Sequence, residues 1–132
     1  MRTHSVGGAR THTAVFECRV GGEIYEEFHD GGRSTWGHVL VYEPGRRVVF
    51  DWHPSREPET AGEVEVRFEP IGGGTRLVLT HTHWERFGKR ARTARRAYGL
   101  GWRYVLDVWT GRRTATVRLL DAISAVQRVF RR

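Results

Sequence analysis

The chain has 132 residues, of which 39% are hydrophobic and 28% charged, a profile that fits one folded domain and argues against disorder. No apolar run approaches the ~20 residues that a membrane-spanning helix needs. The N-terminal sequence also lacks the apolar core of a secretory signal. The single cysteine, Cys18, excludes an internal disulfide and a cysteine-rich metal site. We therefore expect a cytoplasmic protein without a membrane span.

The net charge of +7 is distributed unevenly along the chain. Residues 1–85 carry a net charge of −4, whereas residues 86–132 carry +11. The densest basic stretch comprises Arg86, Lys89, Arg90, Arg92, Arg95 and Arg96. We interpret it as a solvent-exposed helix face attracted to the acidic segment before it, although an acidic partner or an anionic membrane surface would also suit it. No RNA-binding or helix-turn-helix signature accompanies the charge, so nucleic-acid binding is not expected.

Residues 1–13 are mostly polar and are predicted to form a flexible N-terminal tail. Six β-type runs then follow one another, separated by Gly-containing turns and one longer loop at 54–62. The runs are Ala14–Val20, Glu23–His29, Thr35–Glu43, Arg46–His53, Glu63–Glu69 and Thr75–Trp84. Strict alternation within the fourth and fifth runs places apolar side chains on one face. This pattern predicts an antiparallel meander with one face on a core.

The hydrophobic period changes at Arg86. An amphipathic stripe predicts a helix over Arg86–Thr110, and it consists of Tyr98, Trp102, Val105, Leu106 and Trp109. Gly99 and Gly101 interrupt this helix at a cost of about 1 kcal/mol each, which indicates close packing, a bend or space kept for a bound molecule. Because a sheet with one apolar face needs a cover, the helix is expected to pack on it and to enclose a cavity.

A second helical pattern follows Gly111. Its apolar positions are Val117, Leu120, Ile123, Val126 and Phe130. We therefore predict a basic helical extension over residues 111–132, after a domain that spans residues 14–110.

Seven short segments in fixed order resemble a known protein family. They are Val20–Glu26 (VGGEIYE), Trp36–Leu40 (WGHVL), Glu43–Trp52 (EPGRRVVFDW), Val64–Phe68 (VEVRF), Gly73–His81 (GGTRLVLTH), Trp84–Arg86 (WER) and Tyr98–Trp102 (YGLGW). Together they are similar to the SRPBCC domains related to the activator of heat-shock protein 90 ATPase, within the START-like superfamily. The resemblance implies an α+β helix-grip fold, in which a curved antiparallel sheet of about six strands grips a long C-terminal helix around a hydrophobic cavity.

The chain departs from the family pattern at its N-terminus. The resemblance implies an opening strand and two short helices, and only 13 polar residues stand before the second family strand. These elements are therefore expected to be missing, through truncation or a misassigned start. A sheet without its first strand would expose an edge and invite self-association, for example as a homodimer.

Aromatic and apolar residues on the expected inner faces are the candidates for lining the cavity. They are Trp36, Trp52, Phe68, Leu79, His81, Tyr98 and Trp102. Ligand pockets are mostly apolar with a few polar groups, which these side chains would provide. Ordinary core packing is an equally good interpretation for each tryptophan.

A metal centre and a catalytic site receive less support. His81 and His83, together with His53 or His38, would offer zinc ligands, but their spacing matches no recognised metal motif, so no metal and no other cofactor is expected. Asp51, Glu85, His81 and Tyr98 are candidate acid–base groups that form no recognisable triad. Glu85 is expected to pair with Arg86. No residue is therefore assigned a catalytic role.

Three functions stay open at this stage. The first is a non-enzymatic domain that binds a small hydrophobic molecule in the cavity between sheet and helix. The second is a co-chaperone or protein-interaction module whose basic helix meets an acidic partner. The third is an enzyme similar to polyketide cyclases and aromatases, which would use His81 or Tyr98. The superfamily hosts all three, so fold resemblance alone does not choose among them.

Overall fold

The computed structural model describes residues 7–110, 117–120 and 123–131. Six strands precede the main helix: β1 (Thr11–Phe16), β2 (Glu23–Phe28), β3 (Arg33–Glu43), β4 (Arg47–Trp52), β5 (Gly62–Ile71) and β6 (Gly74–Thr82). Each pairs antiparallel with the next in chain order. The predicted meander is therefore confirmed.

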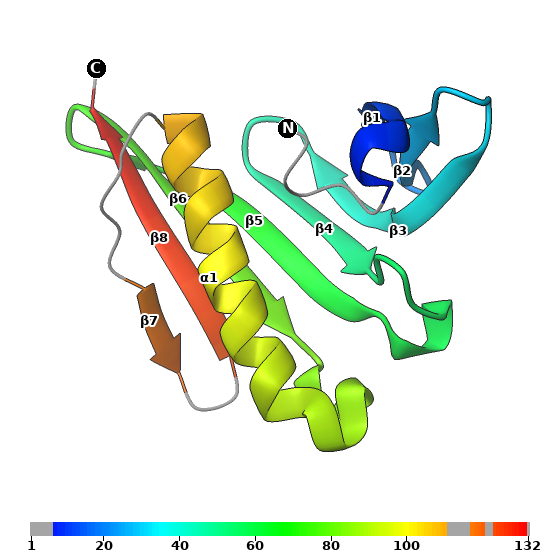
Figure 1. The fold of residues 1–132 in the computed structure, drawn as a ribbon. Helices are drawn as coiled ribbons and strands as arrows, with labels where there is room; N and C mark the ends of the chain where they lie inside the picture. Colours follow the sequence, from blue (N-terminus) through cyan, green and yellow to red (C-terminus); the bar gives the residue numbers. More distant parts are fainter. Residues whose placement is uncertain (1–6, 111–116, 121–122, 132) are drawn as a thin grey trace.

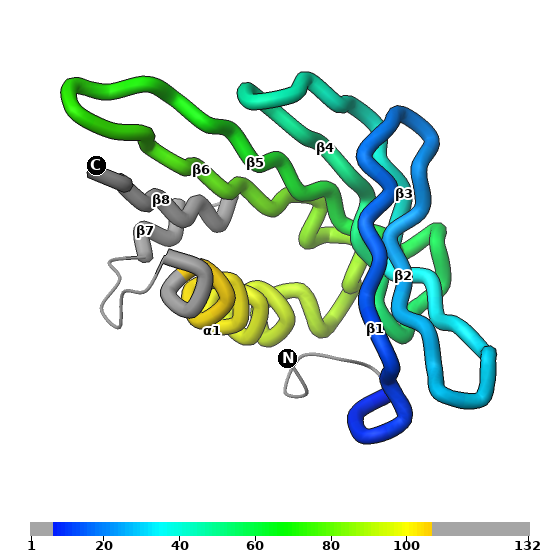
Figure 2. Tube along the Cα trace, turned by 90° about the horizontal axis from the view of Figure 1, so that it is seen from above, coloured from blue at the N-terminus to red at the C-terminus, as the bar shows by residue number. Residues whose placement is uncertain are grey.

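The sheet is curved, and the long helix α1 (Ala91–Thr110) lies on its concave side (Figures 1 and 2). Between them is a continuous apolar core of Ile24, Val39, Phe50, Val64, Leu77, Leu79 and Leu106. This is the helix-grip α+β fold that the resemblance implies. No helix among the described residues is long and apolar enough to cross a membrane.

The alternation in β4 and β5 divides the sheet into an inner and an outer face as predicted. Val48 and Trp52 from β4, with Val66 from β5, pack against the core. On the outer face, Glu65 accepts a hydrogen bond from Arg47 Nε at 2.7 Å. Successive side chains point to opposite sides of a strand, so the sequence pattern alone separates the faces.

The helix begins later than predicted. The segment Trp84–Arg90 forms the 3₁₀ element η3, and α1 follows only from Ala91. Gly88 lies inside η3 with φ 57° and ψ −128°, a positive-φ conformation that interrupts a right-handed helix. The prediction of one helix from Arg86 was therefore wrong, because the hydrophobic pattern does not reveal this glycine's backbone.

The expected flexible tail is partly ordered. After the 3₁₀ turn η1 (Gly8–Arg10), β1 begins at Thr11, so residues 11–13 belong to the sheet. The Glu26 carboxylate, fully buried in β2, accepts hydrogen bonds from the Gly7 backbone N–H at 2.7 Å and from Thr11 Oγ1 at 3.0 Å. A buried carboxylate needs such donors, which explains why this polar segment docks on the sheet. Residues 1–6 lie outside the described residues.

The predicted C-terminal helix is replaced by two strands, β7 (Val117–Leu120) and β8 (Ile123–Arg131). β8 pairs antiparallel with β6 from Gly74 to His81, and β7 pairs with β8. The three-residue spacing of apolar positions suggested a helix. However, an unpaired edge of β6 presents backbone N–H and C=O groups, and a strand pairs with such a row of groups. β8 thus covers the edge of β6, and β1 and β7 are the edge strands of the described sheet. Residues 111–116, 121–122 and 132 lie outside the described residues.

Candidate functional site: an apolar cavity between sheet and helix

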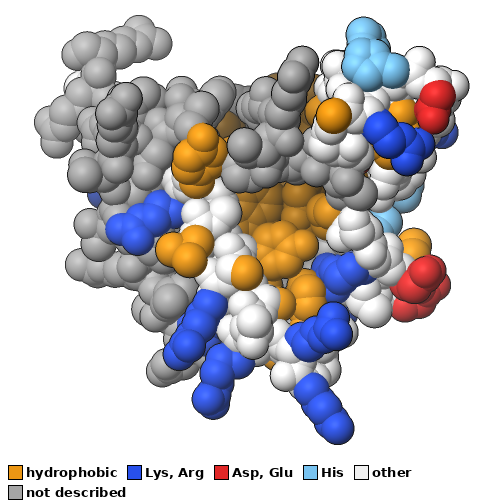
Figure 3. Space-filling view, viewed as in Figure 1, with side chains coloured by type: hydrophobic (Ala, Val, Ile, Leu, Met, Phe, Trp, Pro, Cys, Tyr) orange, Lys and Arg blue, Asp and Glu red, His pale blue; other side chains and the backbone are white. Residues whose placement is uncertain are grey.

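A cavity of about 320 Å³ lies between the end of β4 and one side of α1. Its lining residues are Trp52, Pro54, Ala97, Tyr98, Gly101, Trp102 and Val105. Figure 3 shows apolar side chains at the bottom of the hollow beside the helix, with lysine and arginine side chains nearby. Pockets for small organic molecules start at about 300 Å³, so the space suits a small ligand.

Aromatic rings build one wall of this cavity. The Trp52 and Trp102 rings lie 5.3 Å apart, and Trp52 also contacts Trp36 at 5.6 Å and Phe50 at 5.6 Å between centroids. The indole N–H groups of Trp36 and Trp52 are buried and have no hydrogen-bond partner among the described residues. A buried donor without a partner is costly, so these two N–H groups reduce the stability of the aromatic wall.

Behind this wall, His81 on β6 is fully buried. Trp102 Nε1 donates a hydrogen bond to His81 Nδ1 at 3.1 Å, which places the ring proton on Nε2. The Trp84 ring lies 4.1 Å away and the Tyr98 ring 5.2 Å away. Burial lowers the pKa of His81 to about 3, and the positive charge of Arg56 acts in the same direction. His81 is therefore neutral at physiological pH and orients Trp102 in the cavity wall.

Arg56 fastens the loop after β4, which includes the 3₁₀ turn η2 (Pro58–Thr60), to η3. Its guanidinium lies 3.7 Å from the centroid of the Phe87 ring. It donates hydrogen bonds to the carbonyl oxygens of Thr60 at 2.7 Å and Trp52 at 3.1 Å. Burial lowers the pKa of Arg56, while Tyr98 opposes that change. Sequence reasoning missed this residue because nothing in the loop pattern signals a cation–π contact 31 residues away.

The structure brings three of the seven predicted cavity residues to the lining, namely Trp52, Tyr98 and Trp102. The other four lie elsewhere in the core: Leu79 and His81 are buried, whereas Trp36 and Phe68 pack against the core cluster from its margin. Gly101 lines the cavity, and a methyl group built on it would meet no described atom within 4 Å. At Gly101 the glycine signal in the predicted helix thus corresponds to open space.

The structure separates His81 from His83, the two histidines considered as zinc ligands, and gives Glu85 a different partner from the one expected. His83 has left-handed backbone angles just beyond β6, so it faces the surface while His81 faces the core. Glu85 contacts His83 Nδ1 at 3.1 Å, not the expected Arg86, whose guanidinium donates to the Ala61 carbonyl at 2.8 Å. The sequence spacing of His81, His83 and Glu85 did not reveal this turn, because the left-handed backbone of His83 changes the direction of the chain that follows.

Part of the basic stretch is exposed, and described acidic residues of the sheet pair with other arginines. The carboxylates of β5 form ion pairs with arginines of the sheet itself, such as Glu65 with Arg47 and Glu69 with Arg76. Lys89, Arg90 and Arg92 are exposed at the start of the helix and form no ion pair with a described residue. The carboxylates of the sheet pair with these arginines because the arginines lie directly opposite or diagonal to them on neighbouring strands.

A comparison with protein families supports the assignment made from the fold. The sequence model of the family described as "Activator of Hsp90 ATPase homolog 1-like protein" matches residues 9–108. The chain belongs to this family. The match ends within α1 and includes every residue of the cavity lining. Comparisons with curated proteins and with solved structures give no match.

Proposed function

We propose that this member of the Hsp90-ATPase-activator-like family binds one small, largely apolar molecule, aromatic in part, in the cavity beside α1. The observation that carries the proposal is the lining itself, in which Trp52, Trp102 and Tyr98 surround about 320 Å³ of space next to Gly101. Aromatic rings recognise flat apolar ligands by stacking and edge contacts.

The polar groups of the site favour binding over turnover. Tyr98 is the one ionisable side chain among the described lining residues. General acid–base catalysis needs a group within hydrogen-bond reach of the substrate and a pKa near the working pH. His81 lies behind the wall, holds Trp102 and has a pKa of about 3, so it does not meet the second requirement.

Substitutions at Gly101 test the proposal, because they add volume without removing any contact. Gly101→Leu projects a side chain into the cavity, whereas Gly101→Ala adds a single methyl group to the same position. Both should raise helix stability by up to about 1 kcal/mol, since glycine is a poor helix former. Binding of the dye 8-anilinonaphthalene-1-sulfonate would be followed by fluorescence titration, and any co-purified molecule by native mass spectrometry.

We expect the wild type to bind one dye molecule and Gly101→Leu to bind it at least tenfold more weakly at equal or greater stability. Gly101→Ala should keep most of the affinity. Equal dye affinity in the wild type and Gly101→Leu would refute the cavity as the binding site. Absence of binding by the wild type would refute the proposal itself.

The exposed basic stretch favours a second candidate function, a co-chaperone role as the family description suggests. The exposed side chains of Lys89, Arg90, Arg92 and Arg96 would meet an acidic surface of an Hsp90 chaperone. Attraction between exposed charges is screened within about 10 Å at 0.1 M salt, so this binding should weaken steeply as salt is added. Replacing the four residues by glutamine should abolish the interaction in a biosensor assay. Salt-independent binding would contradict an electrostatic contact.

A further inference from the structure

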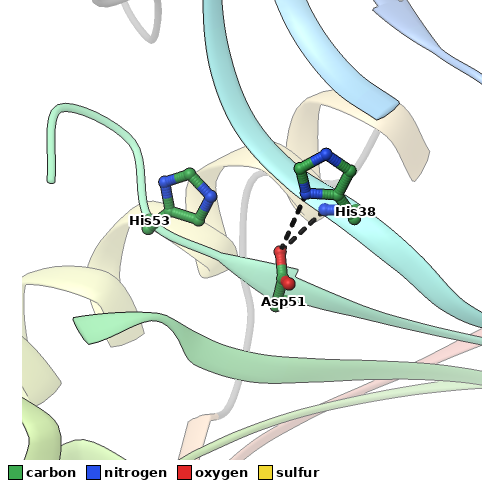
Figure 4. Close-up of side chains that lie close together, drawn as sticks. All are labelled: His38, Asp51 and His53. Atoms are coloured by element: carbon green, nitrogen blue, oxygen red, sulfur yellow. Dashed lines mark hydrogen bonds and ion pairs between the residues drawn. The ribbon is translucent and has the colours of Figure 1, made fainter. Parts of the chain in front are cut away.

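Three potential metal ligands converge on the outer face of the sheet, away from the cavity. They are His38 on β3, Asp51 on β4 and His53 immediately after β4. One donor atom from each lies within 4.8 Å of the others (Figure 4). Trp52 stands between Asp51 and His53 in sequence and lines the cavity, so strand alternation places its two neighbours on the opposite face.

The backbone holds these residues in place. The His53 N–H donates to the Trp36 carbonyl at 2.7 Å, which ties the end of β4 to β3. The His38 N–H donates to Asp51 Oδ1 at 2.7 Å, and His38 Nδ1 lies 4.0 Å from the same oxygen. Between the two anchors is Gly37, where any side chain would collide with the Asp51 carbonyl oxygen. The glycine thus permits the close approach that brings His38 to Asp51.

His53 supplies the observation that points to a ligand. It is 4% exposed, and its Nδ1 lies 3.2 Å from the Arg56 carbonyl oxygen. A carbonyl only accepts, so Nδ1 carries the proton and Nε2 presents a lone pair. This Nε2 is buried without a hydrogen-bond partner in the described part of the chain, and Figure 4 shows the ring turned toward His38 and Asp51. Histidines that bind metals characteristically donate their other N–H to a carbonyl or carboxylate in this way.

We propose that His38, Asp51 and His53 bind a divalent transition-metal ion, with Zn²⁺ as the best match. Two imidazole nitrogens and one carboxylate oxygen form a ligand set typical of zinc, with a fourth position left for water. Metal–ligand distances of about 2.0–2.2 Å require the donor atoms to approach one another to roughly 3.4 Å. The His38 side chain is 49% exposed and supplies most of this movement by rotation, while His53 stays fixed.

No metal was expected from the sequence, because the spacing of His81 and His83 with His53 or His38 matches no recognised metal motif. Those residues face different environments, whereas His38, Asp51 and His53 are joined only by the pairing of β3 with β4. The site is independent of the proposed cavity function, because it lies on the other face of the sheet and shares no residue with the lining.

The test uses the full chain after treatment with a chelator. Zn²⁺ affinity would be measured by calorimetry, and Co²⁺ would replace it as a spectroscopic probe, since its visible absorption reports coordination geometry. We expect one ion per chain and a rise in melting temperature on adding Zn²⁺, because an ion that binds only the folded state stabilises it. We expect Zn²⁺ affinity to fall by at least about tenfold in each of the variants His38→Asn, Asp51→Asn and His53→Gln. Loss of a group that only supports a ligand already lowers metal affinity by about this factor, and loss of the ligand itself should lower it at least as much.

His38→Asn and Asp51→Asn are the decisive variants, because both side chains are partly exposed and their loss leaves the core intact. Circular dichroism would confirm folding of each variant, including the buried His53→Gln. The matched control is the double variant His12→Asn/His29→Asn, which removes a second histidine pair whose rings lie 5.1 Å apart on the surface.

Unchanged Zn²⁺ binding in this control, with loss in His38→Asn and Asp51→Asn, supports the site. Binding that survives in folded His38→Asn and Asp51→Asn, or that disappears in the control, overturns it. Failure of the wild type to bind one Zn²⁺ also overturns the proposal, and neither result bears on dye binding in the cavity.

Discussion

Protonation of the buried His81 should make this protein's stability depend steeply on pH. Burial lowers the pKa of His81 from its ordinary value of 6.5 to about 3 in the folded state. Between these values the unfolded chain binds a proton on this residue and the folded chain does not. Stability therefore falls as the pH is lowered through this window, and it is unaffected by His81 above about pH 6.5.

The size of the effect follows from one proton, which changes the free energy of unfolding by about 1.36 kcal/mol per pH unit. Lowering the pH from 6.5 to 5 should cost about 2 kcal/mol through His81 alone, and about 4 to 5 kcal/mol by pH 3. A loss of 2 kcal/mol is a large part of the total stability of a small domain.

Urea unfolding at pH 7.5 and pH 5 would measure this contribution. His81→Gln removes the titrating ring but keeps a polar side chain, so the variant should be less stable at pH 7.5 yet lose about 2 kcal/mol less than the wild type on acidification. His83→Gln, two residues further on and partly exposed, should keep the wild-type dependence. Equal losses in the wild type and His81→Gln would show that the folded protein protonates His81 near its ordinary pKa, which would refute the reasoning.

Three further predictions concern contacts that hold elements of the fold together. Gly37→Ala should destabilise the fold by several kcal/mol, measured by thermal unfolding, because its Cβ would overlap the carbonyl of the facing strand; Gly72→Ala, with no described atom within 4 Å, should have little effect. Trp102→Phe should cost about 2–4 kcal/mol in urea unfolding, since it strands a buried acceptor and removes part of an indole ring. Glu26→Ala should expose the N-terminal segment to limited proteolysis, because the Gly7 N–H and Thr11 hydroxyl lose their acceptor; unchanged cleavage would contradict this role of Glu26.

Local pattern was sufficient to determine the sheet and its inner face. Alternation in β4 and β5 identified Phe50, Trp52 and Val64 as inward residues, and the structure places them in or against the core. Glycine-containing turns gave the order of the strands. These inferences succeed because side-chain direction in a strand depends only on position in the chain, and because short turns join neighbouring strands.

The two ends of the chain differ from prediction in different degrees. The first strand was predicted at Ala14–Val20 and lies at Thr11–Phe16, where it pairs with β2, whereas Ile123–Arg131 was predicted as part of a helix and is a strand that pairs with β6. The N-terminal segment is held further by the buried Glu26 carboxylate. The partner of β8 is distant in sequence, so propensity within the segment does not reveal it.

Some features of the candidate sites could also be predicted from the sequence, whereas others depend on the tertiary structure. Tyr98 and Trp102 were identifiable from the helical stripe, and Gly101 from its cost within that stripe. By contrast, the close packing of Trp102 on His81, the Arg56 contact with Phe87 and the convergence of His38 with His53 depend on tertiary structure. A one-dimensional pattern determines which face of an element is apolar, whereas the distance between two side chains on different elements is set only when register, curvature and loop paths are fixed together.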